Sequence, residues 1–445
     1  GYQEGAKPGG SFDVTRLVGF VGNLGYTYDN RFLLDASVRS DGSSIYGSNN
    51  RWGTFWSVGV GYNIHNEKFM KELKAFSNFR LKTSYGISGS QNFSTESVNA
   101  TYRYSPDNMY LLWSSAELMG LGNPWLTWQN TRETNIGAEM GLLKNRIMIE
   151  FNYYDKNTTN LLSSMDLPLS SGFPNYIANI GEMNNKGIEA SLNTYIVRNY
   201  ERKFNWILGG QIAYNQNKIV KLSDAIKAQN QRALGLGADI SHLYYEGEPV
   251  DALYVVRSAG IDPSTGTEVY YDKDGNLSKD WKSQDRVFVG SLQPLWRGNL
   301  RSTIMYKNFT LNVSFGYHWG GILYNSTLKN RVEIRRDALA DKNVDERVLS
   351  ARWLKPGDLT FFKGISNEST RATSRYVFKD RKLELQNISF QYRWNNQWLH
   401  DKTGIESLVF GINASNLAYW SSVRYERGTS YPFARNIQSS ITLTF

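Results

Sequence analysis

Histidine is the side chain best suited to acid–base chemistry or metal binding near neutral pH, and this chain has four. His65, His242, His318 and His400 are scattered over the whole length, and none stands at a spacing that brings two ligands to one metal ion. Cysteine is absent, which excludes a thiol nucleophile and a cysteine-based zinc site. No glycine-rich phosphate loop lies between a strand and a helix. The sequence therefore predicts neither an enzyme nor a cofactor; the open alternative is an enzyme that pairs His242 or His318 with a serine or an acid.

One short segment resembles the start of a calcium-binding loop. It runs from Asp272 through Asp274 and Gly275 to Asn276. Its glycine comes too early, and Ser283 stands where a bidentate carboxylate is needed. An Asp-Gly pair is also typical of a tight hairpin turn. We therefore favour a hairpin over a calcium ion bound by Asp272 and Asp274.

Aromatic side chains gather in long segments that are also rich in Asn, Gln and Asp. Two such groups are Tyr102, Tyr104, Tyr110, Trp113, Trp125 and Trp128, and Tyr244, Tyr245, Tyr254, Tyr270, Tyr271, Trp281 and Trp296. Flat aromatic faces beside hydrogen-bonding groups suit sugar rings, but they also suit a small loop core or a protein interface. The candidate residues for contact with a substrate or a covering partner are Trp113, Trp125, Trp128, Trp353 and Asp358.

Strict alternation of apolar and polar residues is the strongest pattern in the chain. From Phe309 to Trp319 the odd positions are Phe, Leu, Val, Phe, Tyr and Trp, whereas the even positions are Thr, Asn, Ser, Gly and His. The pattern recurs in 204–215, 31–39 and 146–153. A period of two residues indicates β-strands with one apolar and one polar face.

Such strands occur in soluble antiparallel sandwiches and in membrane barrels. Sandwich strands are usually about 5–6 residues long, whereas a strand that crosses a bilayer needs about 9–11 residues. The alternating runs reach the second length and carry aromatic residues at their ends, as the interfacial girdles of a membrane barrel do. We therefore predict an all-β fold, a transmembrane antiparallel β-barrel. Its thirteen expected strands are 17–28, 31–40, 51–64, 76–88, 132–142, 146–157, 179–197, 204–215, 298–306, 309–319, 379–392, 407–416 and 436–445.

The connections between these strands alternate in length. Short turns follow the odd-numbered strands, and long connections follow the even-numbered ones, notably 89–131, 216–297 and 320–378. In bacterial outer-membrane barrels the short turns are periplasmic and the long loops extracellular. The first strand then runs from the outside to the periplasm. Because such barrels have an even strand number with both termini in the periplasm, we expect residues 1–445 to be the C-terminal part of a larger barrel whose preceding part is missing.

Composition and charge exclude several other classes. Aromatic residues make up 14% of the chain and charged residues 20%, so the chain has ample material for folded structure and is not disordered. No run of about 18 apolar residues exists, which excludes a bundle of membrane helices. The net charge of +9 is spread over loops and turns without a basic stripe, so nucleic acid is not expected as a partner. Attraction to anionic lipid or to acidic residues of a missing part explains the charge. The charged segment 331–354 is expected to form a helix at the barrel mouth.

Several stretches together resemble the C-terminal part of a SusC/RagA-type TonB-dependent outer-membrane transporter, over nearly all of the chain. The stretches that carry the resemblance are 39–44 (R-x-D-G-S-S), 81–89 (L-K-x-S-Y-G-x-x-G), 123–131 (N-P-x-L-x-W-E-x-T, with Gln129 for the usual acid), 153–162, 184–189, 352–358 and 413–417. The family's Y-x-G-x-D-P-E stretch is absent, and 421–426 stands in its place. The resemblance therefore assigns no particular ligand.

The resemblance implies a 22-stranded barrel in the outer membrane of a Gram-negative bacterium, closed by a plug domain that precedes Gly1. It implies a SusD-like surface lipoprotein as a lid, and TonB as the source of energy through an N-terminal segment. The implied activity is import of a large nutrient, for which we expect an oligosaccharide, with a peptide as the alternative. A passive porin and a soluble sandwich adhesin are the competing readings of the strand pattern.

Overall fold

The computed structural model describes residues 14–46, 50–90, 98–110, 113–167, 171–173, 175–179, 181–235, 243–339, 345–426 and 434–445. The chain divides into two compact units. The first consists of Gly1–Val60, Thr83–Thr134 and Lys156–Met183, and the second of Gly61–Lys82, Asn135–Asp155 and Asn184–Phe445. No helix among the described residues is long and apolar enough to cross a membrane.

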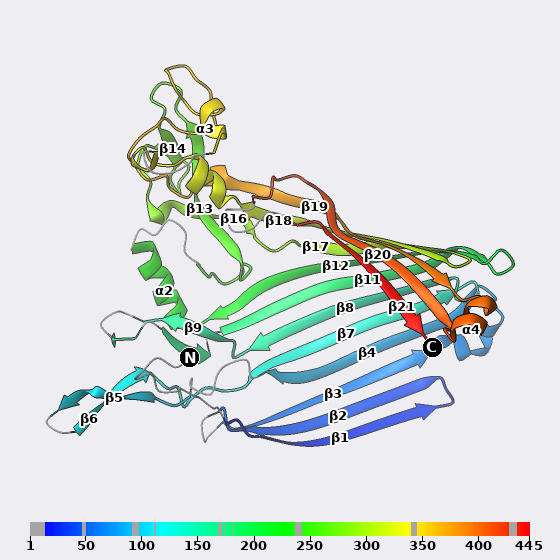
Figure 1. The fold of residues 1–445 in the computed structure, drawn as a ribbon. Helices are drawn as coiled ribbons and strands as arrows, with labels where there is room; N and C mark the ends of the chain where they lie inside the picture. Colours follow the sequence, from blue (N-terminus) through cyan, green and yellow to red (C-terminus); the bar gives the residue numbers. More distant parts are fainter. Residues whose placement is uncertain are drawn as a thin grey trace. The chain divides into compact units, whose positions relative to one another are not determined.

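Within the described ranges, one antiparallel sheet contains thirteen strands, each paired with the next along the chain once the loop strands are left aside (Figure 1). In order they are β1 (Leu17–Tyr28), β2 (Phe32–Ser43), β3 (Trp52–Asn63), β4 (Phe76–Ser90), β7 (Gln129–Leu142), β8 (Ile147–Thr159), β11 (Gly181–Asn199), β12 (Phe204–Leu222), β17 (Trp296–Tyr306), β18 (Phe309–Tyr324), β19 (Val377–Trp394), β20 (Ser407–Ser421) and β21 (Asn436–Thr444). All thirteen predicted strands are confirmed. Several extend further toward the long loops than the sequence pattern indicates, β12 and β18 most clearly.

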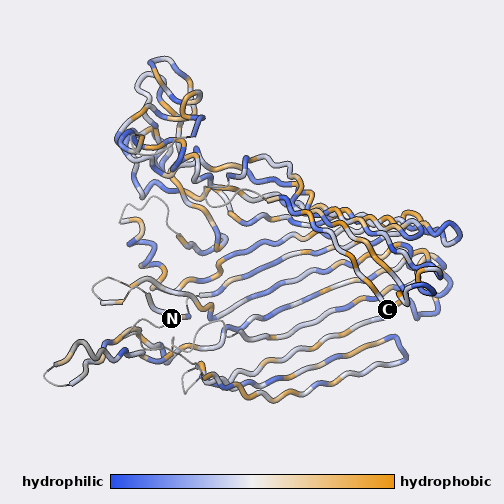
Figure 2. Tube along the Cα trace, viewed as in Figure 1, coloured by the Kyte–Doolittle hydropathy of each residue, from blue (hydrophilic) through white to orange (hydrophobic). Residues whose placement is uncertain are grey.

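The alternation in the sequence becomes a two-faced sheet, visible as alternating hydropathy along each strand (Figure 2). The apolar face stays open in the second unit: Leu300 is 45% exposed, Phe390 41% and Ile412 54%. A sandwich would bury such residues under a second sheet, whereas a lipid-facing surface leaves them at the protein's exterior. The exposure of this face argues against the sandwich alternative.

Short turns close the strand pairs at one end of the sheet, as predicted. The three-residue turn between β1 and β2 places Asp29 and Asn30 at φ 50° and 51°, and Lys307 adopts φ 51° between β17 and β18. Left-handed residues of this kind match the turn to the twist of the strands. The longer connection 395–406 contains α4 (Gln397–Thr403), which begins at the Asn396 cap and ends at Gly404 with φ 71°.

The long connections hold structure of their own, of which the sequence predicts only the hairpin at Asp274 and Gly275. In the first unit lie the hairpins β5 (Thr101–Tyr110) with β6 (Trp113–Gly120), and β9 (Leu162–Asp166) with β10 (Asn175–Asn179). In the second unit, α2 (Asp224–Gly235) precedes a four-stranded sheet in the order β15-β14-β13-β16. Its strands are β13 (Ala252–Ile261), β14 (Glu268–Tyr271), β15 (Leu277–Ser278) and β16 (Arg286–Ser291).

The expectation of one helix over 331–354 is wrong. The described part of the segment holds separate short turns, a π-helix at Leu328–Val332, a 3-10 turn at Asp337–Leu339 and α3 (Arg347–Ser350). Val332 and Val348 pack with Tyr376 in a small core of the loop, so contacts from distant residues replace the weak helical pattern.

Candidate functional site

The polar face of the sheet is the surface from which a site can be built, because its side chains all point to one side. In β8 the even positions carry Glu150 and Asn152, and in β12 the odd positions carry Gln211 and Asn215. Pairing aligns these positions across strands: Gln211 lies opposite Asn299 of β17. A polar wall of the second unit therefore crosses β4, β7, β8, β11, β12 and β17.

Ion pairs hold one part of this wall. The ammonium group of Lys82 lies 2.7 Å from a carboxylate oxygen of Glu139 and 2.8 Å from one of Glu150. These three residues come from β4, β7 and β8. The side chains remain about one third exposed, between 31% and 43%. The pairs contribute little stability at such exposure, but they fix where the charges of the wall stand.

Carboxamides dominate the neighbouring part. Tyr154 donates to Asn215 at 3.0 Å, and the amide groups of Asn215 and Asn217 both donate to Asn185, at 3.4 and 2.9 Å. Such groups both donate and accept hydrogen bonds, so they can bind hydroxyl or amide groups of a neutral ligand.

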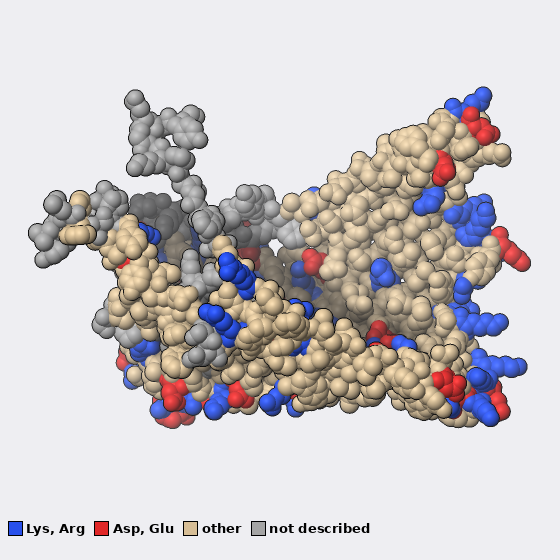
Figure 3. All heavy atoms as spheres, turned by 90° about the horizontal axis from the view of Figure 1, so that it is seen from below, with Lys and Arg blue, Asp and Glu red and all other residues tan. Residues whose placement is uncertain are grey.

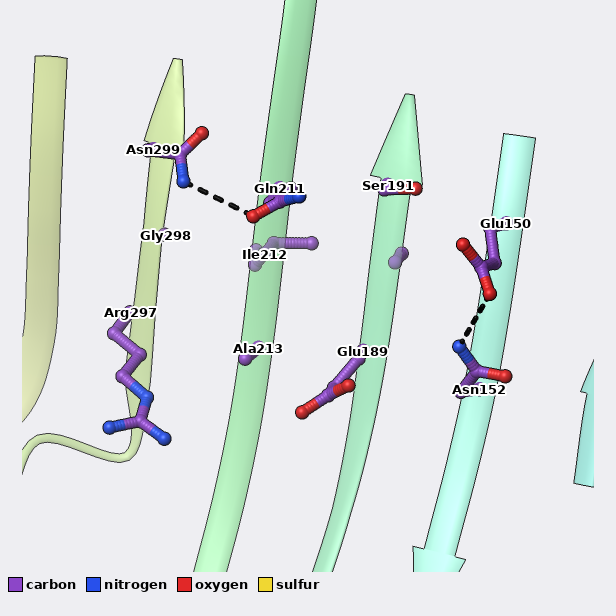
Figure 4. Close-up of a pocket in the computed structure, with 11 residues that line it drawn as sticks. Glu150, Asn152, Glu189, Ser191, Gln211, Ile212, Ala213, Arg297, Gly298 and Asn299 are labelled. Atoms are coloured by element: carbon purple, nitrogen blue, oxygen red, sulfur yellow. Dashed lines mark hydrogen bonds between the residues drawn. The ribbon is translucent and has the colours of Figure 1, made fainter. Parts of the chain in front are cut away.

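A cavity of about 440 Å³ opens on this wall between β8, β11, β12 and β17. Figure 4 shows its residues projecting from four adjacent strands, with hydrogen bonds from Asn299 to Gln211 and from Asn152 to Glu150. Glu189 and Arg297 also line the cavity, so that with Glu150 the lining carries two carboxylates and one guanidinium. The cavity therefore offers neutral hydrogen-bonding groups between opposite charges.

The one histidine contact relevant to the enzyme alternative lies on β18. His318 Nε2 is 2.9 Å from a carboxylate oxygen of Asp380, and Tyr425 donates to the same carboxyl group. In the part of the chain that the structure describes, no serine hydroxyl bonds to His318. His242 lies outside the described residues. The geometry supplies a hydrogen-bonded His–Asp–Tyr group without the nucleophile that a triad requires.

The predicted contact residues of the first unit occupy different environments. Trp113 begins β6 and is 78% exposed, and Trp125 is 72% exposed. Trp128 is buried, stacked on Tyr46 with ring centroids 4.5 Å apart and edge-on to Phe55 at 5.3 Å. Trp128 thus packs in an aromatic core, whereas the other two present free faces. Contact with a substrate or a partner stays a prediction for all three.

Trp353 and Asp358 shape one loop of the second unit. Trp353 donates from its indole nitrogen to the carbonyl of Pro263 at 2.9 Å, and its ring lies against Gly266 and Gly364. Asp358 accepts from the backbone N–H groups of Lys355 and Leu354, which lower the pKa of its carboxyl group. Both residues therefore hold the loop in shape, and their contact with a ligand or lid also stays a prediction.

The Asp272 segment forms the predicted hairpin. Tyr271 of β14 pairs with Leu277 of β15, and Gly275 takes φ 91° in the turn. The carboxylate of Asp272 accepts from the backbone and side-chain nitrogens of Asn276, at 2.8 and 3.1 Å. Among the described residues, no group of three or more His, Asp or Glu side chains is placed to hold a metal ion.

The wall residues around Asn185, Asn215 and Gln211 were not predicted from the sequence as site residues. A signal for them exists, because they occupy the polar positions of alternating strands. The cavity at Gln211 and Asn299 was not visible, since it depends on the register between β12 and β17.

The chain matches one protein family and several known proteins. Residues 5–329 match the family model described as TonB dependent receptor-like, beta-barrel. TonB-dependent receptor P3 of Formosa agariphila is 27% identical over 432 residues, which cover 92% of this chain and 42% of that protein. SusC of Bacteroides thetaiotaomicron is 27% identical over 414 residues, 86% of this chain and 38% of that protein.

The solved structure of the RagAB peptide transporter has the same fold, with a TM-score of 0.84 at 24% identity over 97% of this chain and 47% of that one. The chain thus spans about two fifths of the length of the curated relatives. The prediction of a barrel and the resemblance drawn from the motifs are confirmed: the chain belongs to the TonB-dependent receptor β-barrel family.

Proposed function

We propose that this chain serves in TonB-dependent import of a large nutrient across the outer membrane of a Gram-negative bacterium. The observation that carries the proposal is the polar wall of a family-typical barrel, with its cavity at Gln211, Asn299 and Glu189. A large polar cargo needs a hydrated path lined by groups that exchange hydrogen bonds, and strong apolar or metal sites would retain it.

We propose an oligosaccharide as the cargo. Its hydroxyl groups both donate and accept, as the carboxamides around Asn185, Asn215 and Asn217 do. The exposed rings of Trp113 and Trp125 offer faces on which sugar rings stack. These features support a neutral, hydroxyl-rich ligand.

A peptide is the second candidate, favoured by one specific feature of the cavity. Glu189 and Arg297 line it with opposite charges, which suit the amino and carboxyl ends of a short peptide. The solved structure with the same fold is that of a peptide transporter, which describes that protein and not this chain.

A SusD-like surface lipoprotein is the proposed lid, and a loop of the second unit is its proposed contact. Leu349, Leu354 and Leu359 are 80%, 70% and 86% exposed, and the last two flank Asp358 in the turn after Trp353. Exposed leucines on an ordered loop are typical of a protein interface. TonB, a plug domain and the remaining barrel strands complete the proposed transporter, with no bound cofactor.

Uptake by living cells tests the proposal. A strain that lacks the gene should lose growth on, and uptake of, one glycan, and the gene supplied in trans should restore both. Unchanged uptake of every glycan tested would overturn the carbohydrate assignment. Loss of peptide uptake in the same strain would support the second candidate.

Variants of the cavity separate the two cargoes further. In the purified complex, Gln211→Ala with Asn299→Ala should weaken glycan binding more than Arg297→Gln does. The opposite order, with Arg297→Gln the more damaging change, indicates a peptide. Lys279→Gln on a distant loop serves as the control, since it alters charge without touching the cavity.

A further inference from the structure

The short-turn end of the second unit carries an excess of exposed cations. Eleven Lys and Arg side chains stand there beside five acidic residues, and Figure 3 shows basic side chains projecting along this edge. The basic residues are Lys68, Lys71, Lys74, Lys144, Arg146, Arg198, Arg202, Lys203, Lys307, Arg393 and Lys402; the acidic ones are Glu67, Glu72, Glu201, Asp401 and Glu406. We call the eleven cations the basic rim.

The rim is continuous because backbone hydrogen bonds join each turn to the next. Leu143 donates to the carbonyl of Ala75, and Tyr195 donates to that of Arg146, both at 2.9 Å. The same link joins Lys307 to Lys203 at 2.9 Å. The cations of successive turns therefore lie along one edge.

The rim cations have few partners of their own. Among the described residues, only Arg146 of the rim forms hydrogen bonds through its side chain, to the carbonyls of Tyr195 and Ile196. None of the eleven forms an ion pair with a described carboxylate. The loops at the other end differ: Arg347 bridges Asp345 and Glu426 there. The excess positive charge at the turns is therefore available to an outside anion.

Exposed aromatic rings accompany these cations. Arg198 lies over the ring of Tyr200 at 5.1 Å, and Lys307 lies over Tyr306 at 5.3 Å. Phe69, next to Lys68 in the short helix α1 (Lys68–Lys71), is 61% exposed. Aromatic rings beside Lys and Arg are typical of the water–membrane boundary, where the ring sits at the headgroups and the cation reaches the phosphates.

We propose that the basic rim binds the anionic headgroups of phosphatidylglycerol in the membrane leaflet next to the short turns. The exposed rings favour a lipid surface over an acidic protein, which would need the cations but not the apolar neighbours. The proposal rests on the proposed outer-membrane function, which makes that leaflet the periplasmic one. Each cation near an anionic surface strengthens binding by about fivefold.

Lipid binding to the purified complete transporter, measured by native mass spectrometry with equal amounts of phosphatidylglycerol and phosphatidylethanolamine, tests the proposal. The rim variant combines Lys144→Gln, Arg198→Gln, Lys203→Gln and Lys307→Gln. The control combines Lys273→Gln, Lys279→Gln, Lys282→Gln and Lys355→Gln, which remove the same charge from exposed loop positions.

The wild type and the control should prefer phosphatidylglycerol, and the rim variant should lose at least tenfold of that preference. A variant with Lys144→Arg, Lys203→Arg and Lys307→Arg should keep it. Equal binding of both lipids by the wild type, or a preference that survives in the rim variant, overturns the proposal. Capture of an acidic protein without lipid preference also overturns it.

Lipid binding needs no cargo and no TonB, so its outcome is separate from uptake. A transporter that fails every uptake assay can still show the lipid preference, and the reverse also holds.

Discussion

Arg375 is the residue whose replacement most sharply tests how the long loops of the second unit are built. Its guanidinium bonds to Glu268 of β14 at 2.8 and 3.0 Å and to Glu333 at 2.6 and 2.9 Å. The side chains of Arg375, Glu268 and Glu333 are 5%, 2% and 0% exposed. One cation thus joins two carboxylates that lie 107 and 42 positions away in the chain.

Arg375→Met should destabilise this loop region by about 3–5 kcal/mol, because it leaves two buried carboxylates without their cation. Local opening should become faster while the sheet stays folded. Hydrogen exchange of the amides of Val255 and Val256, both fully buried in β13, should rise by at least a hundredfold. Exchange in β20 and β21 should not change.

Neutralising the two carboxylates that Arg375→Met leaves without a cation provides the control. Arg375→Met combined with Glu268→Gln and Glu333→Gln should recover most of the lost protection, since no buried charge remains. If Arg375→Met leaves exchange in β13 unchanged, the ion-pair network does not hold the loops. If the triple variant is as unprotected as the single one, packing of the arginine stem rather than charge is responsible.

Three further outcomes are expected. Trp128→Ala should destabilise the first unit by about 3–5 kcal/mol through the loss of a buried ring, measured as earlier proteolytic cleavage of its loops; cleavage at the wild-type rate would contradict the aromatic core. Gly187→Val should greatly reduce the amount of heat-modifiable folded protein, because a Cβ there overlaps the ring of Tyr154 and a backbone carbonyl; normal yield would refute the close approach. Arg347 lowers the pKa of Asp345 to about 2, so this bridge should stabilise its loop above about pH 4 and weaken as the pH falls toward 2. Hydrogen exchange across that range checks the bridge, with Asp345→Asn as the variant that should lose the dependence.

The sequence was sufficient for the barrel strands because their signal is local. Alternation from Phe309 to Trp319 requires one apolar and one polar face wherever the strand lies, and the turn at Lys307 needs only two residues. The sequence pattern does not fix the residues at which the strands end. β18 continues to Tyr324 through Gly320 at φ 89°, where a bulge interrupts the period.

The candidate site was only partly visible. The polar positions of β8 and β12 could be read from the pattern, whereas the cavity at Gln211 and Asn299 needs the pairing of β12 with β17, and 73 residues separate these strands in the chain. The sequence does not distinguish the buried Trp128 from the exposed Trp113, since both are tryptophans in aromatic segments.

The sequence by itself determined the strands, their two faces, the short turns and the family, because each depends on neighbouring residues or on short motifs. Only the tertiary structure decided the loop sheet, the Arg375 network and the continuous basic rim. These features join residues that are far apart in the chain, and their free energy comes from burial and charge pairing that no local pattern encodes.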